Sequence, residues 1–388
     1  MTTMRLTLLG ATGSIGGSAV DVMLRHPDRF SAYALVGYRN VDRMRECALQ
    51  LTPDRVVMTD AKAAAELRAQ LPTEIRVDAG MDAAMDAASD ACVDMVLAAM
   101  VGSVGLPAAL AAVRAGKRVG LANKECLVTA GHIFMDAAKR SGAIVVPVDS
   151  EHAAVHQCLA GHDAGSVTRI VLTASGGPFR DRDPASLRDV TPEEAVAHPN
   201  WEMGAKISVD SATMMNKALE LIEARWLFDM PAEKLSAIIH PQSIVHALVE
   251  YCDGSVLAQL ASPDMRAPIA YAMQAEPRLA TGIPWLDLAT SGRLDFQAVD
   301  EHRFPAMRLV RYVMQGGDSL AIAMNAANEV ANLAFREGRL AFTDIVALVE
   351  QVIEGTPDHS VTELDEVWSV DTQARRMAED AVRLAVRS

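Results

Sequence analysis

The chain has 388 residues and a formal net charge of −14. This length allows two or three domains, and the acidic balance argues against a nucleic-acid-binding protein, which would need a basic face. Five scattered cysteines without a Cys-x-x-Cys pair favour reduced thiols in a cytoplasm over a disulfide framework or a zinc site. No apolar run approaches the roughly 20 residues that cross a bilayer, so we expect a soluble protein without a membrane partner.

The first element is an apolar run at 4–9, which predicts a buried strand rather than a signal peptide. It leads into GATGSIG at 10–16, and a helical pattern follows. Strand, glycine turn and helix in this order are typical of a dinucleotide-binding fold, in which the helix N-terminus binds the cofactor pyrophosphate. The spacing G-x-x-G-x-x-G is a variant of the usual motif, and its context favours a cofactor domain.

The next predicted strand, at 32–36, ends in Gly37-Tyr38-Arg39-Asn40. A fold selective for NAD places an acid at this point to bind the ribose hydroxyls. Arg39 stands there instead and suits a 2′-phosphate, so the sequence predicts NADP. The alternative is an arginine that is merely solvated on a loop.

Further strand and helix patterns follow at 94–99, 106–114 and 118–122. The last of these strands delivers Asn123-Lys124-Glu125 at its carboxyl end. Lys124 is therefore placed to reach a substrate or the nicotinamide, although lysines at strand ends are often only solvated.

A short apolar run at 143–148 predicts another buried strand, which ends in Asp149-Ser150-Glu151. On an extended segment, residues i and i+2 point the same way, so we expect the two carboxylates to converge where ligands bind to open α/β sheets. Oxygen ligands alone favour Mg²⁺ or Mn²⁺ over Zn²⁺. Asp-x-Glu is common on surfaces, and the prediction gains weight from Glu220 as a third carboxylate.

The segment 198–228 has the pattern of a polar loop that enters a helix. Ser211 is predicted as the helix N-cap, and Asn216 and Glu220 share one helical face because they are four residues apart. Hydroxyl, amide and ammonium donors suit a phosphate, whereas a carboxylate suits a hard divalent cation. The alternative is a solvated helix face behind a polar loop.

Residues 176–206 combine glycines, prolines and many charges, which is typical of a lid that excludes water from a site. Trp201 is the predicted apolar cover of this lid, with packing against a neighbour as the alternative.

Four other histidines are expected to be structural. His152 and His156 are four residues apart, but they lack a third nitrogen or sulfur ligand and are predicted to be polar packing beside the site. His240 and His246 lie in strand-like sequence, and His246 could face the site.

Strand patterns at 169–173, 237–239, 244–250 and 256–260 are followed by helical patterns at 306–314, 319–336, 343–353 and 372–386. The predicted fold class is α/β, with an N-terminal Rossmann-like NADP-binding domain at 1–148, a central α/β domain for catalysis, metal and substrate at 149–275, a connector at 276–300 and a C-terminal helical bundle at 301–388.

The chain resembles the 1-deoxy-D-xylulose 5-phosphate reductoisomerase family, the NADPH enzymes of the non-mevalonate isoprenoid route. The resemblance covers nearly the full length. It rests on GATGSIG at 10–16, LANKE at 121–125, PVDSEH at 147–152, ASGGPF at 174–179, the segment 198–228, HPQSIVHALVEY at 240–251, DGSVLAQL and PDMR within 253–266, and NAANE at 325–329.

The resemblance implies that NADPH and Mn²⁺ or Mg²⁺, with Co²⁺ as a further option, support the rearrangement and reduction of 1-deoxy-D-xylulose 5-phosphate to 2-C-methyl-D-erythritol 4-phosphate. It implies a metal held by Asp149, Glu151 and Glu220, and a catalytic set that adds Lys124 and His198. The implied substrate ligands are Ser150, Glu151, Ser175, His198, Trp201, Ser211, Asn216, Lys217 and Glu220. The implied cofactor ligands are Thr12, Gly13, Ser14, Ile15, Arg39, Asn40, Asn123, Glu125, Met203 and Gly204.

Three positions depart from the family pattern. Tyr38 precedes Arg39, with the glycine one residue earlier than is common. Cys126 stands where serine is common, and Ala153 where a polar residue is usual. None of these changes removes a proposed ligand or donor.

Two alternatives remain from the residues themselves. A metal-free dehydrogenase of the same architecture would use Cys126 or Cys158 as its nucleophile. An NADP-sensing binding protein without turnover would leave Lys124 and the three carboxylates without a purpose. The long apolar sheet edge and the methionine content of the chain favour a homodimer.

Overall fold

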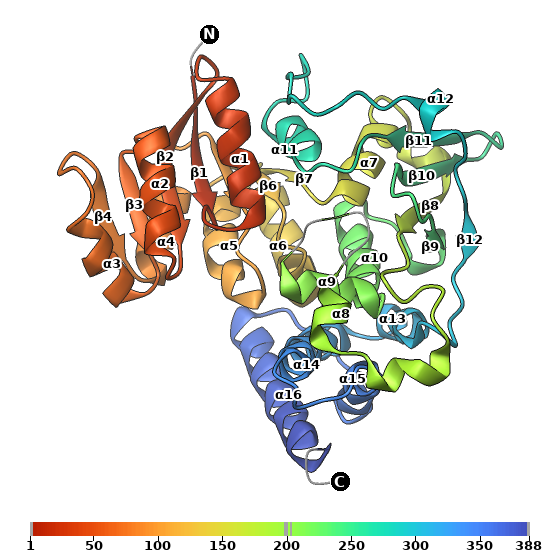
Figure 1. The fold of residues 1–388 in the computed structure, drawn as a ribbon. Helices are drawn as coiled ribbons and strands as arrows, with labels where there is room; N and C mark the ends of the chain where they lie inside the picture. Colours follow the sequence, from red (N-terminus) through yellow and green to blue (C-terminus); the bar gives the residue numbers. More distant parts are fainter. Residues whose placement is uncertain (1–2, 198–200, 202–203, 386–388) are drawn as a thin grey trace. The chain divides into compact units, whose positions relative to one another are not determined.

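The computed structural model describes residues 3–197, 201 and 204–385 (Figure 1). The chain forms two compact units. The first consists of the chain up to Cys126, Phe134–Ala153 and Asp264–Pro284, and the second of Leu127–Ile133, Ala154–Pro263 and the chain from Trp285 onward. None of the helices in the described residues combines the length and apolar character that a membrane crossing requires.

The first unit is built on a seven-stranded parallel sheet in the order β4-β3-β2-β1-β5-β6-β7. The central strands are short, largely apolar and mostly buried, as a parallel sheet with helical crossovers requires, whereas the edge strand β4 is partly exposed. The strands are β1 Met4–Leu9, β2 Phe30–Gly37, β3 Arg55–Met58, β4 Arg76–Ala79, β5 Met95–Ala98, β6 Arg118–Leu121 and β7 Ile144–Pro147. The connecting helices are α1 Ser14–Arg25, α2 Val41–Leu51, α3 Ala61–Arg68, α4 Met81–Ser89, α5 Leu106–Arg114 and α6 Glu125–Ser141.

The first unit also contains a segment from much later in the chain. Helix α11, Arg266–Met273, contacts α1, and its apolar residues Ile269 and Met273 belong to the core that the sheet and its helices share. The Arg118 guanidinium also donates to the Ala272 carbonyl at 2.9 Å. The sequence pattern had assigned these residues to the central domain.

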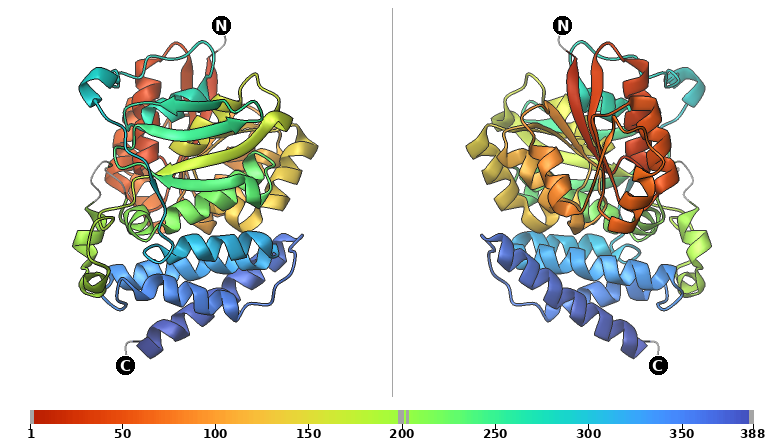
Figure 2. Two further views of the ribbon diagram at one scale, coloured as in Figure 1. Left: turned by 90° about the vertical axis from the view of Figure 1, so that its right-hand side faces the viewer. Right: turned by 90° about the vertical axis from the view of Figure 1, so that its left-hand side faces the viewer.

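The second unit contains a mixed five-stranded sheet in the order β11-β10-β8-β9-β12 (Figure 2). Strands β8 and β9 are parallel, and the other pairs are antiparallel. The strands are β8 Val167–Ala174, β9 Leu235–Ile239, β10 Val245–Tyr251, β11 Val256–Leu260 and β12 Gln297–Ala298. The helices between β7 and the C-terminal helices, apart from α11, are α7 Ser150–Leu159, α8 Pro192–Val196, α9 Ala205–Ala212, α10 Met215–Leu227 and α12 Leu288–Ser291.

The C-terminal helices pack along one another and complete the core of the second unit (Figure 2). They are α13 Pro305–Gln315, α14 Asp318–Arg336, α15 Asp344–Glu354 and α16 Leu364–Ala385. The structure thus confirms the predicted α/β class, with a parallel N-terminal sheet, a second sheet and a helical C-terminal region.

Candidate functional site

The first group of predicted site residues follows the neighbouring parallel strands β6 and β7. Lys124 comes three residues after β6 ends, and Asp149 two residues after β7 ends, so parallel pairing brings both to the same sheet edge. Their side chains form an ion pair although Lys124 is only 5% exposed. The carboxylate partner offsets part of the cost of burying this ammonium group.

Helix α7 corrects one prediction about the acids. Asp149 and Glu151 do not lie on one extended segment, because Ser150 begins α7 and places Glu151 in its first helical turn. The Ser150 hydroxyl donates to the Glu151 carboxylate at 2.5 Å. Further along α7, Ala154, Val155 and Cys158 are buried in the apolar core that contains α10.

Helix α10 carries the third acid. Glu220 is fully buried, and its carboxylate accepts hydrogen bonds from the Asn216 amide at 2.5 Å and from the Lys217 ammonium. The predicted face shared by Asn216 and Glu220 is therefore present. Lys217, at 3% exposure, is buried beside them.

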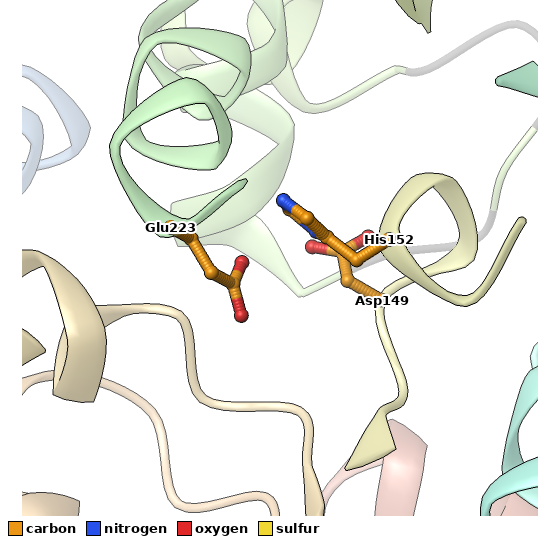
Figure 3. A group of neighbouring side chains, drawn as sticks. All are labelled: Asp149, His152 and Glu223. Atoms are coloured by element: carbon orange, nitrogen blue, oxygen red, sulfur yellow. The ribbon is translucent and has the colours of Figure 1, made fainter. Parts of the chain in front are cut away.

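Within the described residues, two groups of three side chains could hold a metal ion. Asp149, Glu151 and Glu220 each offer one carboxylate oxygen, and these oxygens lie within 4.8 Å of one another. Asp149 also belongs to a second group with His152 and Glu223, whose side chains point toward one another (Figure 3). This second group was not predicted from the sequence, although Glu223 follows Glu220 at the helical spacing of three.

The donor chemistry of the first group fits a hard divalent cation, because all three side chains offer carboxylate oxygens. The Lys124 ammonium forms an ion pair with Asp149, and the Lys217 ammonium forms one with Glu220. The second group includes an imidazole and is suited to softer ions. The first group therefore agrees better with the predicted Mg²⁺ or Mn²⁺.

The predicted phosphate donors lie on a loop and two helices of the second unit. Ser211 is not a helix N-cap, because α9 already begins at Ala205 and Ser211 lies in its last turn. Only Thr213 and Met214 separate α9 from α10, which carries Asn216 and Lys217.

Gly177 joins the loop that carries Ser175 to the end of α9. Its φ is +69°, and a Cβ on it would lie 2.8 Å from the Ala212 Cα and 2.9 Å from the Ser211 carbonyl oxygen. The Gly177 amide donates to the Ser175 hydroxyl oxygen at 3.1 Å. Only glycine allows the Gly177 backbone to lie this close to the backbone of Ser211 and Ala212. This close approach places the loop that carries Ser175 next to the helix turn that carries Ser211.

The glycine turn after β1 has the geometry of a phosphate-binding loop. Gly10 has a φ of +91°, and a Cβ on it would lie 2.4 Å from the Ala99 carbonyl oxygen. A Cβ on Gly16 would likewise lie 2.4 Å from the Gly10 carbonyl oxygen. Helix α1 starts directly after this turn, so the amides around Thr12, Gly13, Ser14 and Ile15 lie at its N-terminus.

The residues predicted to bind the 2′-phosphoribose follow β2. The Arg39 guanidinium lies 4.5 Å from the Tyr38 ring centroid and donates to Asp60 at 2.8 Å, while its side chain is 66% exposed. Asn40 is the N-cap of α2 and accepts from the Arg43 amide at 3.1 Å. The unusual Tyr38 thus packs against the Arg39 guanidinium, and the Arg39 side chain stays exposed.

Two other predicted cofactor residues have structural contacts of their own. Asn123 donates to the Gly102 carbonyl at 2.9 Å and to the Met100 carbonyl, which fixes the loop after β5. Glu125 is the first residue of α6 and is 5% exposed.

The predicted lid is partly described. Its segment 176–197 includes the short helix α8, which begins at a Thr191–Glu194 capping box. The ring centroids of Trp201 and His246 are 6.3 Å apart. Gly204 is the N-cap residue of α9. His198 and Met203 lie outside the described residues.

Three family models match the chain. They are described as 1-deoxy-D-xylulose 5-phosphate reductoisomerase over residues 6–131, its C-terminal domain over 145–228, and DXP reductoisomerase C-terminal domain over 260–377.

Curated relatives of the same name align over nearly their whole length. The one from Burkholderia vietnamiensis is 52% identical over 96% of this chain and 95% of the relative. The one from Pseudomonas putida is 51% identical over 98% of each chain.

Solved structures give the same result. The chain is similar to 1-deoxy-D-xylulose 5-phosphate reductoisomerase from Zymomonas mobilis in complex with NADPH, with 43% identity, a TM-score of 0.92 and coverage of 98% of this chain and 99% of that one. A DOX-P reductoisomerase in complex with NADPH, fosmidomycin and magnesium has 40% identity, a TM-score of 0.92 and coverage of 98% of both chains.

Proposed function

Because the chain belongs to the 1-deoxy-D-xylulose 5-phosphate reductoisomerase family, we propose that it rearranges and reduces 1-deoxy-D-xylulose 5-phosphate to 2-C-methyl-D-erythritol 4-phosphate in isoprenoid precursor biosynthesis. It does so as an NADPH-dependent oxidoreductase with a divalent cation. The observation that carries this proposal is the gathering of Asp149, Glu151 and Glu220, whose carboxylate oxygens lie within 4.8 Å of one another. The known complexes of similar chains with NADPH and magnesium support it.

The three carboxylates are the proposed metal ligands. A divalent cation, when bound, supplies Lewis acidity for the charge that develops on the substrate oxygens. The Lys124 ammonium is held beside Asp149 by their ion pair, so a positive charge is fixed at the strand end where the reacting carbons would lie. Ser150 holds Glu151 in place through its hydroxyl.

Ser175, Ser211, Asn216 and Lys217 are the proposed phosphate ligands. Two hydroxyls, an amide and an ammonium together supply the donors that a phosphate dianion requires. Since Asn216 and Lys217 also bond Glu220, the same turn of α10 would orient the phosphate and the metal end of one substrate.

The proposed cofactor site is the turn between β1 and α1 together with Arg39 and Asn40. NADPH, when bound, supplies the hydride. The helix N-terminus and its amides would hold the pyrophosphate, and Arg39 would pair with the 2′-phosphate. Asn123, Glu125 and Gly204 stay as further proposed cofactor ligands.

The lid is proposed to exclude water from the aldehyde formed during the reaction. Trp201 would be its apolar cover, and His246 contacts its ring. His198 would close over the phosphate, and Met203 would cover the cofactor; both are assigned from the family resemblance.

Several finer points belong to the same proposal. We infer that Mn²⁺ or Co²⁺ can replace Mg²⁺, since each accepts oxygen ligands. We propose that the chain acts in the cytoplasm and that it forms a homodimer. The dimer is supported by the exposed apolar side chains of Trp285 and of Val256, the latter on the edge strand β11. We propose the functional regions 1–148, 149–275, 276–300 and 301–388; the second of them includes helix α11, although this helix packs in the first compact unit.

A cysteine-dependent dehydrogenase is the alternative that the structure disfavours. Cys126 is fully buried, and Cys158 is 6% exposed within the apolar core. Burial raises the pKa of the Cys158 thiol, which suppresses the thiolate that a nucleophile needs. An NADP-binding protein without turnover would not explain the three gathered carboxylates.

The test is the loss of nicotinamide absorbance with 1-deoxy-D-xylulose 5-phosphate as substrate. We expect turnover with NADPH and Mg²⁺ or Mn²⁺, and none after treatment with a chelator. Turnover that survives the chelator but stops with a thiol reagent would point to the cysteine enzyme. Binding of NADPH without any turnover would point to the sensor.

A further inference from the structure

A buried carboxylate lies next to the proposed phosphate ligand Ser211. Asp210 is 1% exposed and is the preceding residue of α9. Its Oδ1 accepts hydrogen bonds from the side-chain amides of Asn328 at 2.9 Å and Asn332 at 2.8 Å. Its Oδ2 lies 3.1 Å from the Lys206 ammonium. A charge so deeply buried persists only where such donors surround it.

The two amides come from the C-terminal helices, more than a hundred residues further along the chain. Asn328 and Asn332 are four apart on α14 and both are fully buried. Asn332 also donates to the Lys206 carbonyl at 2.9 Å and accepts from Arg336 at 2.8 Å. Two asparagines of α14 therefore form hydrogen bonds with a single turn of α9, from Lys206 to Asp210.

Asp210 determines how the Asn328 amide is turned. The Asn328 Oδ1 is buried and accepts no hydrogen bond from the described residues. The reverse orientation would place this oxygen against the carboxylate, where the two would repel each other. The amide thus leaves one of its own atoms unsatisfied in order to donate to Asp210.

The backbone of Asp210 also belongs to the turn that leads into α10. The Thr213 hydroxyl bonds the carbonyls of Val209 and Asp210, each at 3.2 Å, and accepts from the Met215 amide at 3.3 Å. Ser211 lies in the chain between the residues that these hydrogen bonds join. A displacement of Asp210 would therefore move Ser211 and the start of α10 together.

We propose that Asp210, held by Asn328 and Asn332, is a positioning residue for phosphate recognition. Through it, helix α14 sets the affinity of the site for the phosphate group of the substrate. This inference rests on the proposed function, because it assumes that Ser211 and the first turn of α10 bind that phosphate. It gives part of the NAANE motif at 325–329 a role that the sequence did not indicate.

The test compares Asn328→Ala with Asn325→Ala. Asn325 is a matched control: it lies one turn earlier on α14, is fully buried, has an unsatisfied Oδ1, and donates to Glu329 at 3.2 Å instead of to Asp210. The measurements are kcat, the KM values for 1-deoxy-D-xylulose 5-phosphate and NADPH, and the affinity for inorganic phosphate by calorimetry.

For Asn328→Ala we expect the KM for the phosphorylated substrate to rise about tenfold, as for the loss of a hydrogen bond to a charged group. The affinity for inorganic phosphate should fall by a similar factor, while kcat and the KM for NADPH stay within about twofold. Asn325→Ala should leave all four quantities within about twofold. Lys206→Met removes the ammonium donor to Asp210 and should have the same effects as Asn328→Ala. It serves as the test variant if Asn328→Ala does not fold.

An unchanged KM and phosphate affinity in the folded Asn328→Ala or Lys206→Met variant would overturn the inference. Equal effects of Asn328→Ala and Asn325→Ala would also overturn it, because they would show a general loss of packing. If the wild-type chain failed to turn over the substrate but bound inorganic phosphate, the proposed function would fall and the phosphate affinities would still decide the positioning role. A wild-type chain that neither turned over the substrate nor bound inorganic phosphate would refute both.

Discussion

Gly177 offers the sharpest test of how the phosphate donors are assembled. In Gly177→Ala, a residue with a Cβ would have to adopt a φ of +69°, which costs about 1–2 kcal/mol. The new Cβ would also lie 2.8 Å from the Ala212 Cα and 2.9 Å from the Ser211 carbonyl oxygen. These are backbone atoms of α9, so relief of the overlap requires the loop and the helix to separate, at about 1–3 kcal/mol more.

Its neighbour Gly176 is the matched control. Gly176 has a φ of +82°, and the three atoms nearest to a Cβ on it would be the Cδ, Cγ and Cβ of the Arg180 side chain, at 2.9–3.2 Å. A flexible side chain can move aside, so Gly176→Ala should lose only the backbone contribution of about 1–2 kcal/mol. The expected difference between the two variants is therefore about 1–3 kcal/mol in unfolding free energy.

The assay pairs urea denaturation with steady-state kinetics. Because the overlap would push Ser175 away from Ser211, we expect Gly177→Ala to raise the KM for 1-deoxy-D-xylulose 5-phosphate about tenfold or more, and Gly176→Ala to change it less than about threefold. The KM for NADPH should not change in either. Equal losses of stability and equal KM values would refute the reasoning that the Gly177 contact joins the two serines.

Three further predictions concern the metal, the cofactor and the thiols. Glu220→Gln should lower kcat by at least about a hundredfold and weaken Mn²⁺ binding, measured by titration of the paramagnetic ion; unaltered Mn²⁺ affinity would exclude Glu220 as a ligand. Arg39→Leu should lower kcat/KM with NADPH about 10- to 100-fold and leave the value with NADH nearly unchanged, and an equal loss with both cofactors would reject its role at the 2′-phosphate. An alkylating reagent should label the exposed Cys92 and Cys252 without loss of activity, because burial raises the pKa of the Cys158 thiol; mass spectrometry of the labelled enzyme, alongside its rate, checks this.

Much of the fold could be predicted because its elements have clear local periodicity. The strand predicted at 256–260 and the helix predicted at 106–114 coincide with β11 and α5. The last helix was predicted to begin at 372, but it begins at Leu364. Helix starts depend on capping and on tertiary packing, which the hydrophobic pattern of one sequence reports poorly.

The same limit explains the two corrections in the site. Ser211 has the residue type of an N-cap, but α9 had already begun behind Gly204, a residue without a capping side chain. Ser150 begins α7 immediately after Asp149, so the geometry expected of a strand does not apply to Glu151. In both cases the residue types were sound evidence for chemistry, and the local backbone could not be derived from them.

Helix α10 separates what spacing can predict from what it cannot. Asn216 and Lys217 precede Glu220 by four and three residues, and Glu223 follows it by three, so periodicity alone places each of them next to Glu220 on the helix surface. The hydrogen bonds to Glu220 follow from that spacing. Glu223 has the sequence signature of a solvated acid, yet it is fully buried and lies beside His152 (Figure 3). Burial depends on which element covers a face, and that element comes from a distant part of the chain. An acid on a predicted helix therefore becomes a reliable ligand candidate only when a second segment has independently been assigned to the same site.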